Sequence, residues 1–231
     1  HYTEVYLVEH KSEVENVIKN YIIRVKNLKG LKVSKFRCDN GGEYIGKSLQ
    51  QWFQSKGIET DYTIPHTPQL NGKSERLNRS ILNKTRALMF QAQLPKEMWG
   101  EAVKTAAYLL NRSPTEATPG TTPIENWTGR KPDLSRLQIF GTDACAKVLG
   151  YLKKLDVRSK RFIFVGYGTN GYRLWDPERR RIIRSRDVVF GNFLENGEVK
   201  AEDEKEVDIL EALFEDDEEE VFKPDVIGNN G

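Results

Sequence analysis

Two acidic residues, Asp39 and Glu75, occupy positions at which carboxylates can do chemistry. Asp39 follows a predicted strand over residues 31–38, and open α/β sheets tend to place functional side chains at the ends of their strands. Glu75 opens a predicted helix, and 35 residues separate it from Asp39. Carboxylates that converge from different elements can hold hard divalent cations such as Mg²⁺. A pair of these cations would activate the attacking oxygen and stabilise the leaving one in phosphoryl transfer.

The spacing of these two residues does not by itself exclude coincidence. The chain carries 34 aspartates and glutamates, so many Asp–Glu pairs occur at any given separation. On spacing alone, both residues could equally be ordinary solvated carboxylates.

Helix geometry places cations beside Glu75. At about 100° per residue, Arg79 and Arg86 fall within roughly 40° of Glu75 on the helical wheel. Three apolar residues on the other side are expected to face the core: Leu77, Ile81 and Leu88. We assign three residues of this helix to DNA contact: Asn78, Arg79 and Arg86. The alternative is a solvated helix face without a ligand.

The segment before Glu75 supplies further polar candidates, which we expect to lie in a loop that precedes the helix, with His66 between Pro65 and Pro68. The candidates for DNA contact are His66, Gln69, Asn71 and Lys73. A lone histidine is more often structural, and Gln69 and Asn71 could equally cap the helix.

A predicted basic hairpin lies in the second half of the chain. Six arginines occur within fourteen residues: Arg173, Arg179, Arg180, Arg181, Arg184 and Arg186. Cationic strands interleaved with aromatic residues suit phosphate contacts and stacking. We expect Tyr167, Tyr172 and Trp175 to fill the core, and we assign nucleic-acid contact to Arg173, Arg179, Arg180, Arg184 and Arg186. The alternative is an ordinary exposed hairpin.

Alternating patterns of strands and helices must position these residues. Strands are predicted over residues 3–8, 31–38 and 58–64, and helices over 12–28, 47–56, 74–91 and 96–111. This order indicates an α/β fold with a mixed sheet flanked by helices. Short strands over residues 139–140, 144–149, 161–167, 171–176 and 181–190 indicate a small barrel. Trp99, Tyr108 and Leu109 occur at helical spacing and are predicted to pack in a core.

Charge is divided unevenly along the chain. Residues 192–231 carry fifteen acidic residues and three lysines, or −12, whereas the remaining 33 basic and 19 acidic residues give +14. A basic body indicates a polyanionic partner, although a lysine-rich soluble surface would look similar. The acidic tail is typical of a disordered interaction segment, and it could bind protein or lie against the basic body and compete with DNA.

Composition excludes several classes of protein. Two cysteines are too few for a disulfide framework, which favours a reduced intracellular compartment. No apolar run approaches the roughly 20 residues of a membrane span, and the first residues lack a signal peptide. They also begin inside a predicted strand without an initiator methionine, so we expect a fragment. Four segments are predicted: 1–113, the α/β core; 114–136, a connector; 137–191, the barrel; and 192–231, the tail.

Long motifs around these residues resemble one family. RCDNGGEY around Asp39, IPHTPQLNGKSERLNRSI around Glu75, LPKEMWGEAVKTAAYLLNRSPT and KRFIFVGYGTNGYRLWD occur in the order found in integrases of copia-type long-terminal-repeat retrotransposons. The resemblance covers most of residues 1–191. It implies a ribonuclease-H-like catalytic core without its first strands, followed by an SH3-like barrel that binds DNA.

The resemblance also implies roles for individual residues. Asp39 and Glu75 would be the second and third members of the catalytic and metal-binding triad, which uses Mg²⁺ or Mn²⁺ for DNA integration. The first aspartate has no counterpart, because Asp39 is the earliest aspartate in the chain. Metal binding and activity in isolation are therefore expected to be weak or absent. No zinc is expected, because the histidines lack matching cysteines. The intact family acts on element and target DNA in the nucleus, as a homo-oligomer.

Three other functions remain open on the sequence. A catalytically silent nucleic-acid-binding remnant is favoured by the missing aspartate. A ribonuclease-H-type hydrolase is disfavoured by the barrel, and a protein-interaction module acting through the tail is disfavoured by the basic body.

Overall fold

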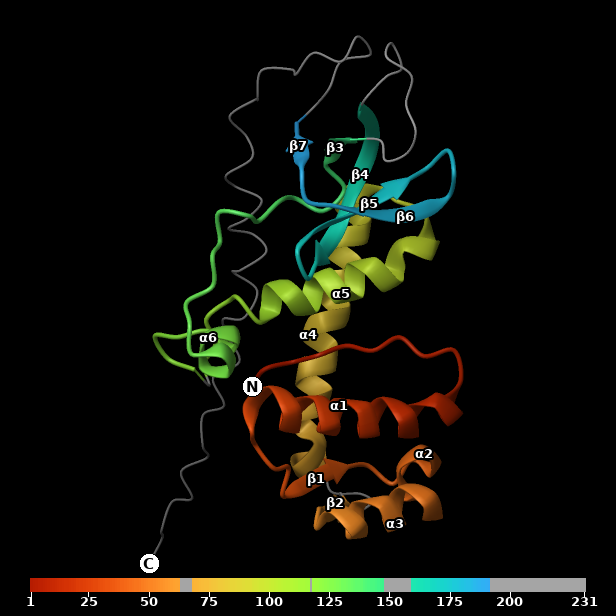
Figure 1. The fold of residues 1–231 in the computed structure, drawn as a ribbon, viewed down its shortest axis with the longest axis vertical. Helices are drawn as coiled ribbons and strands as arrows, with labels where there is room; N and C mark the ends of the chain where they lie inside the picture. The colour runs from red at the N-terminus through yellow and green to blue at the C-terminus, as the bar shows by residue number, and fades with distance from the viewer. Residues whose placement is uncertain (63–67, 117, 148–158, 192–231) are drawn as a thin grey trace, which may run out of the picture. The chain divides into compact units, whose positions relative to one another are not determined.

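The computed structural model describes residues 1–62, 68–116, 118–147 and 159–191 (Figure 1). The chain divides into two compact units. The first comprises His1–Arg112 and Pro123–Pro132, and the second comprises Ser113–Thr122 and Asp133–Gly231. In the described residues, none of the helices is long and apolar enough to cross a membrane.

The first unit combines helices with a small parallel sheet. Strands β1 (Lys35–Cys38) and β2 (Glu59–Tyr62) pair in parallel. The connection between them carries α2 (Gly42–Ile45) and α3 (Lys47–Lys56), because parallel strands need a crossover. The other elements are η1 (Lys11–Glu13), α1 (Val14–Lys29), α4 (Pro68–Ala92), η2 (Lys96–Met98), α5 (Trp99–Leu110) and α6 (Pro123–Thr128).

An apolar core holds α1 and α3 on this sheet. Leu49 and Phe53 of α3 are fully buried against Ile22 of α1, and Phe36 of β1 packs on them. The bounds predicted for α3 are confirmed. The helix ends at Gly57, which adopts the left-handed conformation (φ 66°) that glycine tolerates without strain.

The start of α1 differs from the prediction. The helix predicted from residue 12 begins with η1 at Lys11, and Ser12 does not cap it. Instead, the Glu13 carboxylate accepts a hydrogen bond of 2.9 Å from the His10 backbone N–H. Glu15 accepts hydrogen bonds from Lys19 and Ser48, and so it ties α1 to α3.

The strand predicted over residues 3–8 is wrong, because none is assigned to this segment. The Asn111 side chain engages Thr3 on both sides, accepting from its N–H at 2.9 Å and donating to its C=O at 2.7 Å. Tyr6 packs edge-on against Tyr21 of α1, and Leu7 lies where a side chain at Gly100 would sit. Side-chain contacts, rather than strand pairing, therefore hold this segment.

The helix that carries Glu75 begins earlier than predicted. α4 starts at Pro68, and a proline suits the first turn because its missing N–H would be unpaired there in any case. Gln69, Asn71 and Lys73 therefore lie in a helix and not in a loop, and Glu75 lies within the helix rather than at its start. The helix runs through Gly72 although glycine weakens a helix by about 1 kcal/mol.

The second unit is an antiparallel sheet of five strands in the order β6-β5-β4-β3-β7. These strands are β3 (Asp143–Lys147), β4 (Ser159–Gly168), β5 (Gly171–Asp176), β6 (Arg181–Ser185) and β7 (Val188–Phe190). The single strand predicted over residues 181–190 is thus two strands. No strand is assigned to residues 139–140.

The link between β6 and β7 shows that this sheet is curled. These strands form its two edges, which in a flat sheet of this size would lie about 19 Å apart. Ser185 and Val188 are three chain steps apart, which limits their separation to about 11 Å. The edges must therefore approach each other, as in a small barrel.

Aromatic residues fill the second unit, as predicted. Tyr172 and Trp175 are 8% and 6% exposed, and Tyr167 packs against the same cluster around Phe164. The Tyr167 hydroxyl accepts a hydrogen bond from the Gln138 N–H, which closes the connector over the sheet. In the first unit, by contrast, Trp99 is 55% exposed. Its predicted burial is wrong, because it opens α5 on a face that the unit's own core does not cover.

Candidate carboxylate site and nucleic-acid interface

Asp39 lies directly after β1, where the chain turns sharply. Its Oδ1 accepts a hydrogen bond of 3.0 Å from the Gly41 N–H. A Cβ on Gly41 would come within 3.0 Å of this oxygen and of the Glu43 carboxyl carbon. A larger residue at position 41 would therefore push these side chains aside, and the turn holds the exposed Asp39 carboxylate at the end of the strand.

Negative charge at the end of β1 changes the pKa values of groups near Asp39. Burial, together with the charges of Asp39 and Asp61, raises the pKa of the Cys38 thiol to about 11. Burial and Asp39 also raise the pKa of Tyr44. Asp61 is paired with a cation: Arg37 donates to its carboxylate at 2.8 Å, and this contact lowers the pKa of Asp61. The end of β1 thus has a negative potential to which Asp39 contributes.

The exposed face of α4 carries Glu75 together with the predicted cations. Glu75, Arg79 and Arg86 are all exposed, as is Asn78. On the other side, Ile81 and Leu88 are 7% and 3% exposed, which confirms the predicted orientation of the helix. Arg86 Nη1 donates to Asn83 Oδ1 at 3.1 Å.

The donors in the described part of the chain do not complete a site for a divalent cation. Among those residues, no group of three or more His, Cys, Asp or Glu side chains comes together in an arrangement that could hold a metal ion. Asp39 and Glu75 would supply two carboxylates, and one oxygen of Asp39 already accepts the Gly41 N–H. A site for two divalent cations needs more carboxylate ligands than this pair supplies, so the pair alone is a poor fit. His66 lies outside the described residues.

The arginine hairpin of β5 and β6 presents its cations to solvent. Arg179, Arg180, Arg184 and Arg186 are exposed, and Arg173 is half-buried. The exposure of these side chains agrees with the prediction that they point away from the core. Burying unpaired guanidinium groups would be costly, whereas phosphate binding needs them accessible.

A buried carboxylate that sequence reasoning missed supports the turn of this hairpin. The Asp176 side chain is 2% exposed, and its Oδ1 lies 3.0 Å from Lys160 Nζ and 3.2 Å from the Arg179 N–H. Burial by itself would raise the pKa of Asp176, but Lys160 and the Arg179 N–H outweigh it, so that this pKa lies below its usual value. The ionised carboxylate fixes the backbone that carries Arg179.

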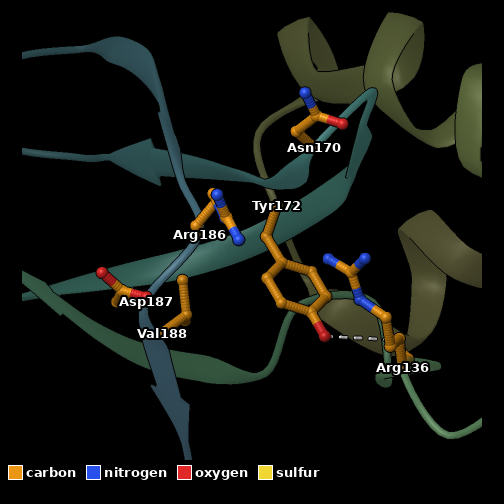
Figure 2. A pocket seen from close by; sticks show the side chains of 6 residues that line it. All are labelled: Arg136, Asn170, Tyr172, Arg186, Asp187 and Val188. Carbon is orange, nitrogen blue, oxygen red and sulfur yellow. Dashed lines mark hydrogen bonds between the residues drawn. The ribbon is translucent and has the colours of Figure 1, made fainter.

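A pocket of about 520 Å³ opens at the junction of β6 and β7. It is lined by Arg136, Asn170, Tyr172, Arg186, Asp187 and Val188 (Figure 2). The guanidinium carbon of Arg136 lies 5.4 Å from the centre of the Tyr172 ring, and the Tyr172 hydroxyl donates to the Arg136 carbonyl at 3.3 Å. Arg136 was not predicted, because it lies outside the hairpin and no local motif marks it.

Comparisons with known proteins find one matching domain family and several relatives of this chain. Residues 146–204 match the retroviral polymerase SH3-like domain. The chain is 44% identical over 189 residues to the retrovirus-related Pol polyprotein from transposon TNT 1-94 of Nicotiana tabacum, covering 80% of this chain and 14% of that protein. It is 32% identical over 192 residues to the Pol polyprotein from transposon RE1 of Arabidopsis thaliana, covering 82% and 13%. The chain thus spans about one seventh of these relatives or less.

Solved structures with a similar arrangement include the catalytic core domain of BIV integrase, at 24% identity and a TM-score of 0.40 over 55% of this chain and 76% of that one. A simian T-cell lymphotropic virus intasome in complex with PP2A regulatory subunit B56 gamma is 17% identical, at a TM-score of 0.42 over 72% and 58%. The expected order of an α/β unit and an all-β unit is confirmed by the secondary structure, and the SH3-like family of the second unit by the match to residues 146–204.

Proposed function

We propose that this chain, which belongs to the retrovirus-related Pol polyproteins of transposons, is their integrase segment and binds DNA through the arginine hairpin of its second unit. The observation that carries this proposal is the exposure of five arginines at one hairpin whose aromatic residues are buried: Arg179, Arg180, Arg181, Arg184 and Arg186. The aromatic side chains pack in the sheet, and the guanidinium groups are accessible at the surface. Their fork of N–H donors matches the geometry of phosphate oxygens.

The charge of the chain supports a polyanionic partner. Outside residues 192–231 the chain carries +14, and release of counterions from DNA phosphates would drive binding without regard to base sequence. On α4 of the first unit, Arg79 and Arg86 are exposed cations on the same helix as Glu75. We assign these two residues and Asn78 to contacts with the DNA backbone.

The second part of the proposal concerns strand transfer. Asp39 and Glu75 are assigned to the carboxylate site at which such integrases attack a target phosphodiester with a 3′-hydroxyl, with Mg²⁺ or Mn²⁺ as the cofactor. Two carboxylates fall short of the donors that this cofactor needs, so we derive no reaction step for this chain alone. DNA binding without strand joining is the activity that its described residues favour. The intact protein would act in the nucleus, as an oligomer on element and target DNA.

The test compares two double variants that each remove two positive charges. One is Arg180→Gln with Arg184→Gln on the hairpin. The other, a matched control, is Lys26→Gln with Lys56→Gln on exposed helix positions of the first unit. Affinity for a labelled duplex, measured by fluorescence anisotropy, should fall about tenfold in the hairpin variant and about twofold in the control. Equal losses in both variants would mean that binding is diffuse and would reject the hairpin as the interface.

A further inference from the structure

The pocket beside Tyr172 lies where the curled sheet closes on itself. Arg186 and Asp187 form the short link between the edge strands β6 and β7, and Val188 begins β7. Arg136 reaches the same space from the segment before β3. Since the β6–β7 link can exist only if the sheet curls, the position of these side chains is set by the fold of the unit.

Two guanidinium groups approach the pocket from separate segments. Figure 2 shows those of Arg136 and Arg186 on either side of the Tyr172 ring, with Asn170 at the rim. Within the described residues, neither arginine forms an ion pair with a carboxylate at 4 Å or less. Asp187 is the carboxylate among the lining residues, so the lining carries two positive charges and one negative.

Arg136 is held in place before any ligand binds. Its side chain lies over the Tyr172 ring, and its carbonyl accepts the Tyr172 hydroxyl. Tyr172 is itself fixed, because it is 8% exposed and packs against Phe164 and Phe190. Less side-chain entropy is therefore lost when a ligand engages this arginine.

We propose that this pocket takes one nucleotide of a DNA single strand, with its phosphodiester between Arg136 and Arg186 and the edge of its base at Asp187. A phosphodiester carries one negative charge and so balances the net charge of the lining. The Asp187 carboxylate accepts hydrogen bonds only, which selects a base with an exocyclic amino group, such as cytosine, over thymine. A stacked and paired base cannot enter a pocket as a whole nucleotide, so the ligand is unpaired DNA. This inference rests on the proposed DNA-binding function and deepens it.

The phosphate contact is tested by the salt dependence of binding to a labelled oligo(dC) of about ten nucleotides. Each phosphate contact on a single strand contributes about 0.7 to the slope of log K against log salt. Arg136→Gln and Arg186→Gln should each reduce the slope by about 0.7, and the double variant by no more, because both arginines hold one phosphate. Lys147→Gln, at an exposed lysine on β3 of the same sheet outside both the pocket and the hairpin, should leave the slope unchanged.

A reduction of about 1.4 in the double variant would show two separate phosphate contacts and overturn the shared site. Pocket variants that behave like Lys147→Gln would reject the pocket altogether. If the hairpin variant Arg180→Gln/Arg184→Gln still loses duplex affinity in that case, the proposed DNA-binding function survives. If the unaltered chain binds neither single strands nor duplex, the proposed function itself fails.

The base contact is tested with oligo(dC) and oligo(dT) of equal length. The chain should prefer oligo(dC) by about tenfold, as one discriminating hydrogen bond allows, and Asp187→Asn should abolish the preference because an amide both donates and accepts. Equal affinity for both oligonucleotides in the unaltered chain would overturn the assignment of the base. Inorganic phosphate should not displace oligo(dC) at millimolar concentration. Displacement would show a site for simple anions instead of a nucleotide.

Discussion

Arg173 of β5 and Arg184 of β6 face each other directly across the hairpin. Directly opposed residues lie on the same face of a sheet, and like charges in such a pair destabilise it. The neighbouring pairs, Leu174 with Ile183 and Trp175 with Ile182, are apolar and support the fold. A sheet that retains an unfavourable pair of cations at this position gains most when a polyanion lies over it.

Replacing one member of this pair should therefore stabilise the second unit while weakening its binding. We expect Arg184→Thr to raise the free energy of unfolding by about 0.5 kcal/mol, because it removes the repulsion and adds a residue with high strand propensity. Duplex affinity should fall in the same variant. Chemical denaturation and fluorescence anisotropy measure the two effects, and Arg181→Thr is the control. A variant that loses both stability and affinity would contradict this account of the pair.

The buried carboxylate Asp176 is expected to be essential for the hairpin turn. Asp176→Asn removes the charge that Lys160 faces at 3.0 Å and should lower the free energy of unfolding by about 2 kcal/mol. Glu178→Gln is a matched control, since Glu178 contacts the same ammonium at 2.6 Å but is 76% exposed. Its loss should stay below about 0.5 kcal/mol. Equal losses in the two variants would show that burial of Asp176 is unimportant.

The same contact predicts how stability depends on pH. The pKa of Asp176 lies below its usual value in the folded chain, because Lys160 and the Arg179 N–H outweigh its burial. Its contribution is therefore present above the unfolded pKa of about 3.9 and is lost as pH falls through the lower folded pKa. Unfolding curves between about pH 6 and pH 3 should show this loss in the unaltered chain and a weaker dependence in Asp176→Asn.

The thiol of Cys38 reports the potential at the end of β1. With its pKa raised to about 11 by burial and by Asp39 and Asp61, it should react slowly with iodoacetamide at pH 8. Asp39→Asn should lower this pKa and speed the reaction severalfold, whereas Glu59→Gln, at the other end of the strand pair, should not. Mass spectrometry of the labelled peptide distinguishes Cys38 from Cys145. An unchanged rate in Asp39→Asn would show that Asp39 does not face the thiol.

Strand transfer by the chain alone is expected to be absent. The described residues offer two carboxylates for the cofactor and not three, and each missing ligand weakens binding of Mg²⁺. The assay incubates the purified chain, a labelled element end and target DNA with Mg²⁺ or Mn²⁺. Joined product that disappears in Glu75→Gln would show that an incomplete acidic site suffices. Product that persists in Glu75→Gln would point to a contaminating activity.

Local signals in the sequence predicted those elements that local interactions determine. α3 and β5 have the predicted bounds. Gly57 ends the helix, and the strand begins at Gly171 and ends at Asp176, two residue types that are common in turns. The start of α4 was missed because Asn71-Gly72 is typical of a turn, although the helix runs through it. Residues 3–8 alternate like a strand, but Asn111 engages the backbone of Thr3.

In the candidate site, too, the sequence predicted features that depend on neighbouring residues but not those that depend on long-range contacts. Exposure of Arg179 and Arg180 follows from their place in the turn between β5 and β6, a local property. The pocket depends on contacts that sequence spacing does not reveal, since Tyr172 bonds to the carbonyl of a residue 36 positions earlier, Arg136. The buried pair of Lys160 and Asp176 likewise joins two strands through a register that only the fold defines.

The salt dependence of duplex binding by the full chain tests the central proposal most directly. Affinity for a labelled duplex is measured by fluorescence anisotropy between about 50 and 200 mM salt, where each phosphate contact contributes about 0.9 to the slope. If the four exposed hairpin arginines assigned to nucleic-acid contact and Arg79 and Arg86 of α4 engage phosphates, log K should fall linearly with log salt at a slope of about −5, and Arg180→Gln/Arg184→Gln should reduce the steepness by about 1.8. A slope near zero, or no binding at about 50 mM salt, would contradict the proposal that this chain binds DNA through its hairpin.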